Sequence, residues 1–118
     1  MTAPHHHAYR ILDLSLTYHW YDEIAAGHKH EEYRDLTYYW RKRLMLCSAG
    51  CTKICEEGCP NLKMKQYDAV RFHRGQGGKT SMTFECNGIS IGRGMPALGA
   101  SVINRQFIIA LGKRLDNE

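Results

Sequence analysis

The second half of the chain consists of short strand-like segments separated by glycine-containing turns, and this pattern limits the chain to a β-rich fold. β-Branched and aromatic residues recur in 67–73, 81–91 and 105–111, as is typical of strands. The glycine-rich stretch 75–78 predicts a flexible hairpin turn between the first two segments, and Asn87, which precedes a glycine, predicts a break within the second. We therefore expect a core built on short strands.

The first half of the chain supplies one clear strand and one clear helix. Leucines at every second position of 9–16 predict a strand with one face in the core. A helix is expected over 18–26, because Thr17 is a favourable N-cap and Gly27 readily adopts the left-handed conformation that ends helices. The polar segment 29–34 is expected to form a second strand.

A second helix is expected over 36–46, with Asp35 as its N-cap. Its apolar face would be formed by Leu36, Tyr39, Trp40 and Leu44. Two early helices and a series of strands predict an α+β domain whose five to six strands curl into a small β-barrel. With 118 residues the chain is long enough for one core only. We therefore expect a flexible N-terminal tail at 1–8 and a single domain over 9–118.

Composition and charge narrow the class of protein. Hydrophobic residues make up 43% of the chain and charged residues 24%, which is the usage of globular domains rather than of disordered or coiled-coil chains. The chain has no run of about 18 apolar residues to span a bilayer, and histidines occupy 5–7, where a signal peptide needs an apolar stretch. We expect a cytoplasmic protein without a membrane partner. The net charge of +4 permits a polyanionic partner without requiring one.

The most unusual local sequence is a group of charges that follows the first predicted helix. Gly27, Lys29, Glu32 and Arg34 occur in the pattern G-x-K-x-x-E-x-R. On a strand, Glu32 and Arg34 lie on one face, so Lys29 joins them only if the turn at Gly27 brings it round. A carboxylate accepts hydrogen bonds from the amino groups of a polar ligand, while Lys and Arg donate to carbonyl or phosphate oxygens. The alternative is that these residues are solvated surface ions in weak pairs.

The G-x-K-x-x-E-x-R motif, placed after a strand and a short helix, resembles the signature of the ASCH domain family, whose fold is a small β-barrel related to PUA domains. All four signature positions match in order and spacing. A looser resemblance to small bacterial and bacteriophage members continues through 39–44, 67–72, 82–91 and 107–115. The resemblance covers most of the chain outside 47–60 and implies a small PUA-like β-barrel.

The resemblance implies a cleft in which Lys29, Glu32 and Arg34 face a ligand, with RNA or a nucleobase-containing small molecule as the expected ligand class. Some members of the family resemble RNA-binding modules, at least one group is a ribonuclease, and another is an amidohydrolase that removes acyl groups from N4-acylated cytidine. In the amidohydrolase group the motif lysine assists a threonine nucleophile three residues later. This chain has Glu32 at that position, so the nucleophile of that mechanism is absent.

Binding without catalysis is the first hypothesis, and two alternatives stay open. In a hydrolase acting on RNA or on a modified nucleoside, Lys29 and Glu32 would be the catalytic residues, with Lys29 stabilising developing charge and Glu32 acting as general base. His28 or His30 is an alternative base for RNA cleavage. The second alternative is an adaptor whose cysteine-rich insert and aromatic surface contact a protein partner.

Further ligand contacts are expected from aromatic and basic residues close to the motif. Unstacked bases are commonly held against aromatic rings, and Tyr18, Trp20 and Tyr33 neighbour the motif in sequence. Arg71 and Arg74 form a second basic stretch beside the glycine-rich turn. We expect these five residues to contribute to ligand binding.

Four cysteines recur at every fourth position of a predicted insert at 47–60, namely Cys47, Cys51, Cys55 and Cys59. On one continuous helix their sulfur atoms would extend over about 18 Å, whereas a tetrahedral Zn²⁺ needs all four at about 2.3 Å. A structural zinc site therefore requires a folded insert. Disulfide or redox chemistry and unligated thiols are the alternatives, and Cys86 is expected to lie in the core.

Overall fold

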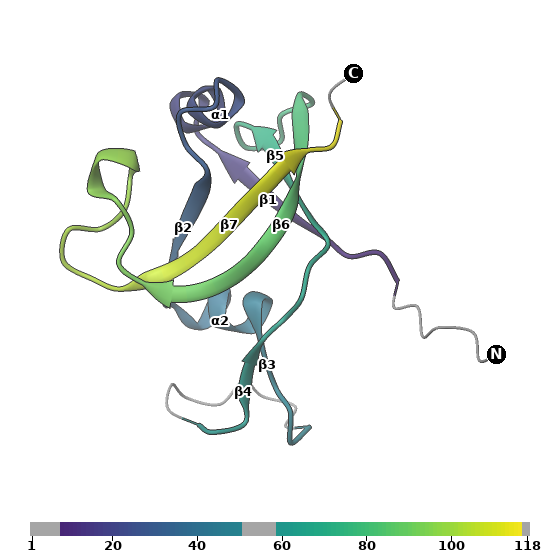
Figure 1. The fold of residues 1–118 in the computed structure, drawn as a ribbon, viewed down its shortest axis with the longest axis vertical. Helices are drawn as coiled ribbons and strands as arrows, with labels where there is room; N and C mark the ends of the chain where they lie inside the picture. The colour runs from purple at the N-terminus through teal and green to yellow at the C-terminus, as the bar shows by residue number, and fades with distance from the viewer. Residues whose placement is uncertain (1–7, 51–58, 117–118) are drawn as a thin grey trace.

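The computed structural model describes residues 8–50 and 59–116, which form seven strands, two α-helices and one 3₁₀ helix (Figure 1). The elements are β1 (Ile11–Leu16), α1 (Tyr18–Ala25), β2 (Glu31–Asp35), α2 (Tyr38–Leu44), β3 (Met45–Cys47), β4 (Leu62–Met64), β5 (Ala69–Arg74), β6 (Ser81–Gly92), η1 (Pro96–Leu98) and β7 (Gln106–Arg114). The α+β class predicted from the sequence is confirmed. The predicted tail lies outside the described residues except for Ala8.

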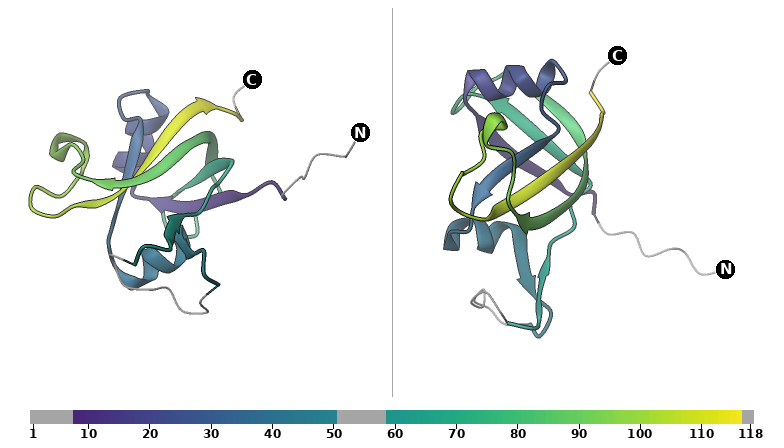
Figure 2. Two further views of the ribbon diagram at one scale, coloured as in Figure 1. Left: turned by 60° about the horizontal axis from the view of Figure 1, so that its bottom comes forward. Right: turned by 60° about the vertical axis from the view of Figure 1, so that its left-hand side comes forward.

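Five strands form one sheet in the order β1-β5-β6-β7-β2, and β3 and β4 form a separate two-stranded ribbon. β1 runs parallel to β5, whereas the other neighbouring pairs are antiparallel. The large sheet curls strongly and wraps around the core as a half-barrel (Figure 2). This agrees with the small barrel-like fold expected from the pattern of short strands.

Side chains join the two edges of the curled sheet. Arg34 on edge strand β2 donates from Nη2 to the carbonyl oxygen of Ser15 on edge strand β1 over 3.1 Å. Arg43 of α2 donates in the same way to the carbonyl oxygen of Asp13 over 3.2 Å. Two carbonyl groups on the free edge of β1 therefore have partners, although no strand pairs with that edge.

The core lies inside the half-barrel, and a helix packs at each end of it (Figure 1). Tyr21 and Ile24 of α1 are buried, and so is Leu44 of α2. The leucines that alternate along β1 point into the core as predicted. Together the strands contribute Leu12, Leu14, Leu16, Val70, Phe72, Met82, Phe107 and Ile109 to the buried cluster. Among the described residues, no helix is long and apolar enough to cross a membrane.

The second helix is shorter than the sequence predicts. α2 begins at Tyr38 because Thr37 is its N-cap, and the Thr37 Oγ1 accepts a hydrogen bond from the backbone N–H of Trp40 over 3.3 Å. The predicted cap, Asp35, is instead the last residue of β2, where its carboxylate accepts a hydrogen bond from a glutamine of β7. Tyr39 is 59% exposed, so its predicted place on the apolar face of the helix is wrong.

One prediction about the strands is corrected, and the structure adds a ribbon that the sequence did not predict. β6 is continuous from Ser81 to Gly92, and instead of breaking at Asn87 its pairing with β7 shifts register around that residue, as in a β-bulge. The predicted insert begins at Cys47, the last residue of β3, and ends at Pro60, shortly before β4. The two strands pair from Met45 with Met64 to Cys47 with Leu62. The curled sheet has five strands, within the predicted five to six, and the ribbon adds two short strands that the sequence did not predict. The predicted turn between β5 and β6 is confirmed.

Candidate functional site

The turn after α1 brings the motif lysine to the other motif charges. Gly27 has a φ of +83°, a left-handed conformation that suits glycine, and the chain enters β2 shortly afterwards. Lys29 Nζ lies 2.9 Å from Glu32 Oε1, and Arg34 Nη1 lies 2.8 Å from Glu32 Oε2. Lys29, Glu32 and Arg34 form one unit, called the charged cluster below.

The charged cluster faces the interior of the half-barrel. Glu32 and Arg34 stand opposite Ile109 and Phe107 in the ladder between β2 and β7, and both of these partners are fully buried. Lys29 is only 2% exposed and Glu32 only 4%, whereas the Arg34 side chain is 19% exposed. These residues are therefore not solvated surface ions. Their ion pairs offset the cost of removing the charges from water.

Aromatic rings line the charged cluster. Lys29 Nζ lies 4.1 Å from the centroid of the Trp20 ring and 5.2 Å from that of Tyr33. The guanidinium carbon of Arg34 lies 5.1 Å from the centroid of Trp40. Cation–π contacts of this kind stabilise a cation that has lost its water. Trp20 and Tyr33 thus lie at the cluster, and their predicted contact with a ligand stays a prediction. Trp40, which the sequence pattern predicts only as part of a helix face, also contacts the cluster.

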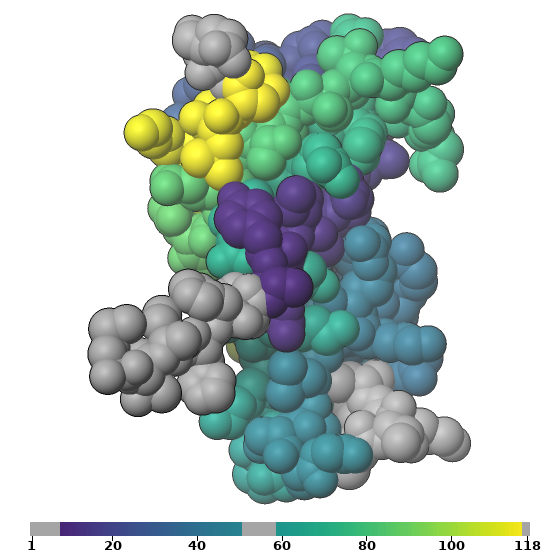
Figure 3. Space-filling view, turned by 90° about the vertical axis from the view of Figure 1, so that its right-hand side faces the viewer, coloured from purple at the N-terminus to yellow at the C-terminus, as the bar shows by residue number. Residues whose placement is uncertain are grey.

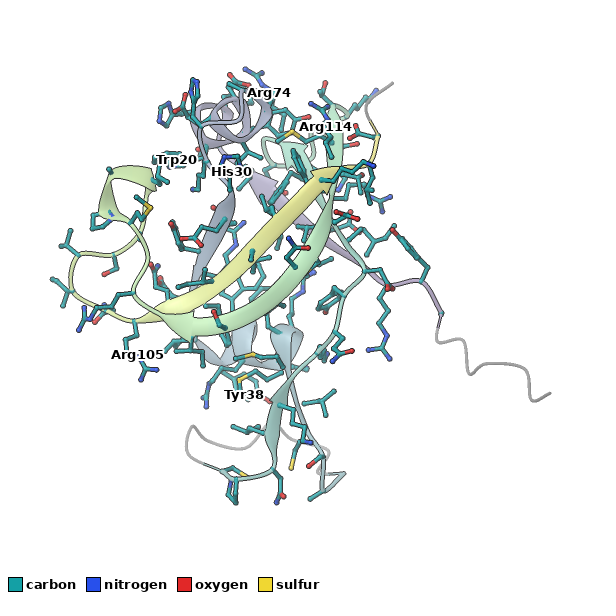
Figure 4. The ribbon with its side chains drawn as sticks, viewed as in Figure 1. Trp20, His30, Tyr38, Arg74, Arg105 and Arg114 are labelled. Carbon is teal, nitrogen blue, oxygen red and sulfur yellow. The ribbon has the colours of Figure 1, made fainter. Side chains whose placement is uncertain are left out.

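The loop between β6 and β7, residues 93–105, packs against the same rings. The backbone N–H of Met95 donates to the Tyr33 hydroxyl over 3.2 Å, and that hydroxyl donates to Glu31 Oε1 over 2.7 Å. Burial raises the pKa of Tyr33 to about 12; the hydrogen bond from Met95 opposes this shift and the Glu31 carboxylate adds to it. Figure 4 shows Trp20 between α1 and the loop. No sequence pattern singled out this loop as part of the site.

One nitrogen atom of the Arg34 guanidinium has no hydrogen-bond partner among the described residues. Its two Nη atoms contact Glu32 and the carbonyl oxygen of Ser15. Its Nε is buried and has no hydrogen-bond partner among the described residues. Buried polar atoms are normally paired, so this Nε–H is the donor of the cluster that a further acceptor could use.

Two of the other predicted residues lie together at the far end of α1 from the cluster turn. Arg74 contacts both carboxylate oxygens of Asp22 at 3.0 Å, and its guanidinium carbon lies 4.3 Å from the centroid of the Tyr18 ring. Tyr18 is 61% exposed and lines an open pocket of about 460 Å³ together with Gly75 and Gln76 of the β5–β6 turn. These residues do not contact the charged cluster, and their role in ligand binding stays a prediction.

Arg71 belongs to a third group, which joins β1 to β5. Its Nε and Nη2 lie 2.7 and 3.2 Å from the carboxylate oxygens of Asp13, and His73 Nε2 lies 2.7 Å from the same carboxylate. The hydrogen bond from Arg71 lowers the pKa of Asp13; partial burial opposes this shift and His73 adds to it. The structure does not bring Arg71 to the charged cluster, and its predicted contact with a ligand stays a prediction.

The predicted cysteine site lies only partly within the described residues. Cys47 is buried at the end of β3 and Cys59 is half-buried; Cys51 and Cys55 lie outside the described residues. Over 8–50 and 59–116, no group of three or more His, Cys, Asp or Glu side chains is arranged to hold a metal ion. The zinc site therefore stays a prediction without support. Cys86 packs against the core, where burial raises the pKa of its thiol.

The fold and the cluster together define a small α+β half-barrel protein with a charged site that faces inward. No family model, curated protein or solved structure matches the chain. The resemblance to the ASCH domain family accordingly stays a prediction that depends on the motif.

Proposed function

We propose that the protein binds RNA or a nucleobase-containing ligand, which contacts the charged cluster. The observation that carries this proposal is the pairing of one carboxylate, Glu32, with Lys29 and Arg34 among aromatic rings. Such a group offers acceptors, donors and stacking surfaces, which are the contacts that the edge and the face of a nucleobase require. The resemblance of the motif to the ASCH signature points to the same class of ligand.

A contribution to stability does not by itself explain why three charged residues lie beside the core. Replacing a buried ion pair with apolar side chains of similar volume is often neutral or stabilising, and Ile109 and Phe107 already provide apolar neighbours on the adjacent strand. Arg34 is the most exposed member of the cluster and holds the unpartnered Nε. Its guanidinium is therefore the first point of contact in this proposal.

In this proposal the 93–105 loop moves when the ligand reaches Lys29 and Glu32, because both side chains are almost fully buried and the loop packs on Tyr33 and Trp20, the rings that flank Lys29. Ligand binding is then expected to change the surroundings of Trp20, whose ring contacts Lys29. The fluorescence of Trp20 reports this change most directly in a Trp40→Phe background, since the chain has two tryptophans.

The test is a titration of wild type, Lys29→Ala and Arg34→Lys into a labelled single-stranded RNA of about 12 nucleotides, and separately into free nucleosides. Lysine keeps the charge of Arg34 but loses the planar fork that contacts both Glu32 and Ser15. We expect Arg34→Lys to bind roughly tenfold more weakly, as after the loss of a hydrogen bond to a charged group. Lys113→Ala, at an exposed position of β7, is the control and should bind like wild type.

Circular dichroism and thermal unfolding of each variant separate a loss of binding from a loss of fold. The proposal is supported if folded Arg34→Lys binds intact RNA or nucleoside more weakly than wild type does, while the control binds it equally well. Equal affinity of wild type and Arg34→Lys overturns it, and so does the absence of binding to every probe. If wild type cuts the RNA into fragments on a denaturing gel and folded Glu32→Gln leaves it intact, the protein is a ribonuclease instead.

A further inference from the structure

We propose that α2 and the β3–β4 ribbon bind the phosphate backbone of an RNA strand that continues from the Arg34 end of the charged cluster. This inference rests on the proposed function and names a second part of the same site. The residues that define the surface, called the α2–ribbon surface below, are Tyr38, Tyr39, Lys42, Arg43, Lys63 and Lys65.

The segment around this surface carries the whole net charge of the protein. Residues 36–67 contain six Lys or Arg and two Glu, a net charge of +4, which equals the net charge of the entire chain. The rest of the chain has ten basic and ten acidic residues and is therefore balanced. A positive charge concentrated on one part of a domain is the electrostatic footprint of a polyanion-binding surface.

The structure places the α2–ribbon surface at one end of the molecule. Figures 1 and 3 show α2 and the ribbon extending beyond the half-barrel. Lys42 and Lys63 are exposed, and Lys65 Nζ donates to the carbonyl oxygen of Lys42 over 3.2 Å, which ties the ribbon to α2. In the part of the chain that the structure describes, no salt bridge involves Lys42, Arg43, Lys63 or Lys65. Their charges remain available to an anionic partner.

Alternating cations and rings connect the α2–ribbon surface to the charged cluster. The guanidinium carbons of Arg34 and Arg43 lie 5.1 and 5.2 Å from the centroid of Trp40. Arg43 in turn lies 5.8 Å from the centroid of Tyr39. Tyr39 is 59% and Tyr38 53% exposed, and Figure 4 shows Tyr38, the first residue of α2, at the end of the half-barrel away from α1.

This combination fits a single nucleic-acid strand better than an acidic peptide. Exposed tyrosine rings are stacking platforms for bases, and lysine ammonium groups beside them neutralise phosphates. A strand held at Arg34 therefore meets rings and unneutralised cations as it passes over α2 to the ribbon. An acidic peptide would use the charges and leave the exposed rings without partners.

The test is the salt dependence of binding to single-stranded RNA of about 12 nucleotides, measured between about 50 and 200 mM salt. Lys42→Ala/Lys63→Ala removes two exposed charges from the surface, and Lys79→Ala/Lys113→Ala removes two exposed charges elsewhere as a matched control. Each phosphate contact contributes about 0.7 to the slope of log K against log salt for single strands. We expect the surface variant to reduce the magnitude of that slope by about 1.4, and the control to leave it unchanged.

A second variant, Tyr38→Ala/Tyr39→Ala, tests the stacking contribution. We expect it to weaken RNA binding about tenfold with the salt slope unchanged, because stacking contributes without releasing counterions. Thermal unfolding should show both surface variants to be as stable as wild type, since the substituted side chains are exposed.

Each outcome separates this inference from the proposed function. If the Lys42→Ala/Lys63→Ala variant and its control change the salt slope equally, the α2–ribbon surface is overturned. It is also overturned if an oligo-aspartate of equal charge displaces the labelled RNA as well as unlabelled RNA does. RNA binding that is weakened by Arg34→Lys and unaffected by the surface variants keeps the proposed function and overturns this inference. Absence of RNA binding by wild type overturns the inference, while nucleoside binding alone would keep the proposed function.

Discussion

Glu32 is the residue on which the charged cluster depends. Its two carboxylate oxygens hold Lys29 and Arg34, and its side chain is 6% exposed. Removal of one partner from a buried ion pair leaves the other charge without compensation in surroundings that solvate it poorly. The stability of the cluster is therefore measurable by a change at this one position.

Glu32→Gln is expected to lower the free energy of unfolding by about 3–5 kcal/mol, because it leaves Lys29 and Arg34 without their carboxylate. Denaturant unfolding followed by circular dichroism measures the change. Glu23, whose side chain is 33% exposed and lies 3.5 Å from His28, provides the control, and Glu23→Gln should stay within about 0.5 kcal/mol of wild type. Similar values for the two variants would show that the cluster contributes little to stability.

Tyr33 is expected to make the free energy of unfolding depend on pH in the alkaline range. Its pKa is about 12 in the folded protein against 10.0 for an unperturbed tyrosine, so the folded protein keeps a proton that the unfolded chain releases. The contribution is complete below pH 10 and is lost as the pH rises toward 12. Urea unfolding across this range should give a shallower decline of the unfolding free energy for Tyr33→Phe than for wild type. Parallel declines would contradict this origin.

The loop between β6 and β7 packs closely against Tyr33 of β2 at Gly94. A Cβ on Gly94 would overlap the ring of Tyr33, whereas a Cβ on Gly92 would only meet a methyl group of Ile108 at 3.5 Å. We expect Gly94→Ala to lower the free energy of unfolding by about 1–3 kcal/mol through overpacking and to shift the fluorescence of Trp20. Gly92→Ala is the matched control. An unchanged spectrum and stability in Gly94→Ala would mean that the loop does not pack on the ring in solution.

Elements with a repeating pattern could be predicted from sequence, and elements decided by tertiary contacts could not. The alternating leucines of β1 specify its buried face without reference to the rest of the chain. At the start of α2, both Asp35 and Thr37 are acceptable N-caps, and only the pairing of β2 with β7 assigns Asp35 to a strand. The ribbon strands have three residues each, which is too few for a periodic signal.

The candidate site shows the same division. Its three charges are close in sequence, so the motif identified them as candidates, but whether Lys29 joins Glu32 and Arg34 depended on the turn at Gly27. Their burial could not be predicted, because it depends on the curl of the sheet that brings the edge of β1 to Arg34. Neither could the contact of Arg34 with Trp40, which requires α2 to lie beside β2.

At the scale of the whole molecule, two arginines contact the free edge of β1, Arg34 from the opposite edge strand β2 and Arg43 from α2, where a closed barrel would have a ladder of backbone hydrogen bonds. Arg43→Gln is expected to lower the free energy of unfolding by about 1.5 kcal/mol and to speed amide hydrogen exchange in β1, because the Asp13 carbonyl loses its partner. Hydrogen exchange by mass spectrometry measures the second effect. Arg93→Gln is the control, since Arg93 donates to the Ile103 carbonyl within one exposed loop. Unchanged exchange in β1 of Arg43→Gln would contradict this role.

The two arginines that contact the free edge of β1 also affect how the protein behaves in concentrated solution. An unpaired strand edge is a template onto which a strand of another molecule can add, the first step toward fibrils. Arg34 and Arg43 occupy two of the acceptors that an incoming strand would use. The same guanidinium that we propose for ligand recognition thus helps to protect the fold against self-association, so substitutions at Arg34 carry a risk of aggregation.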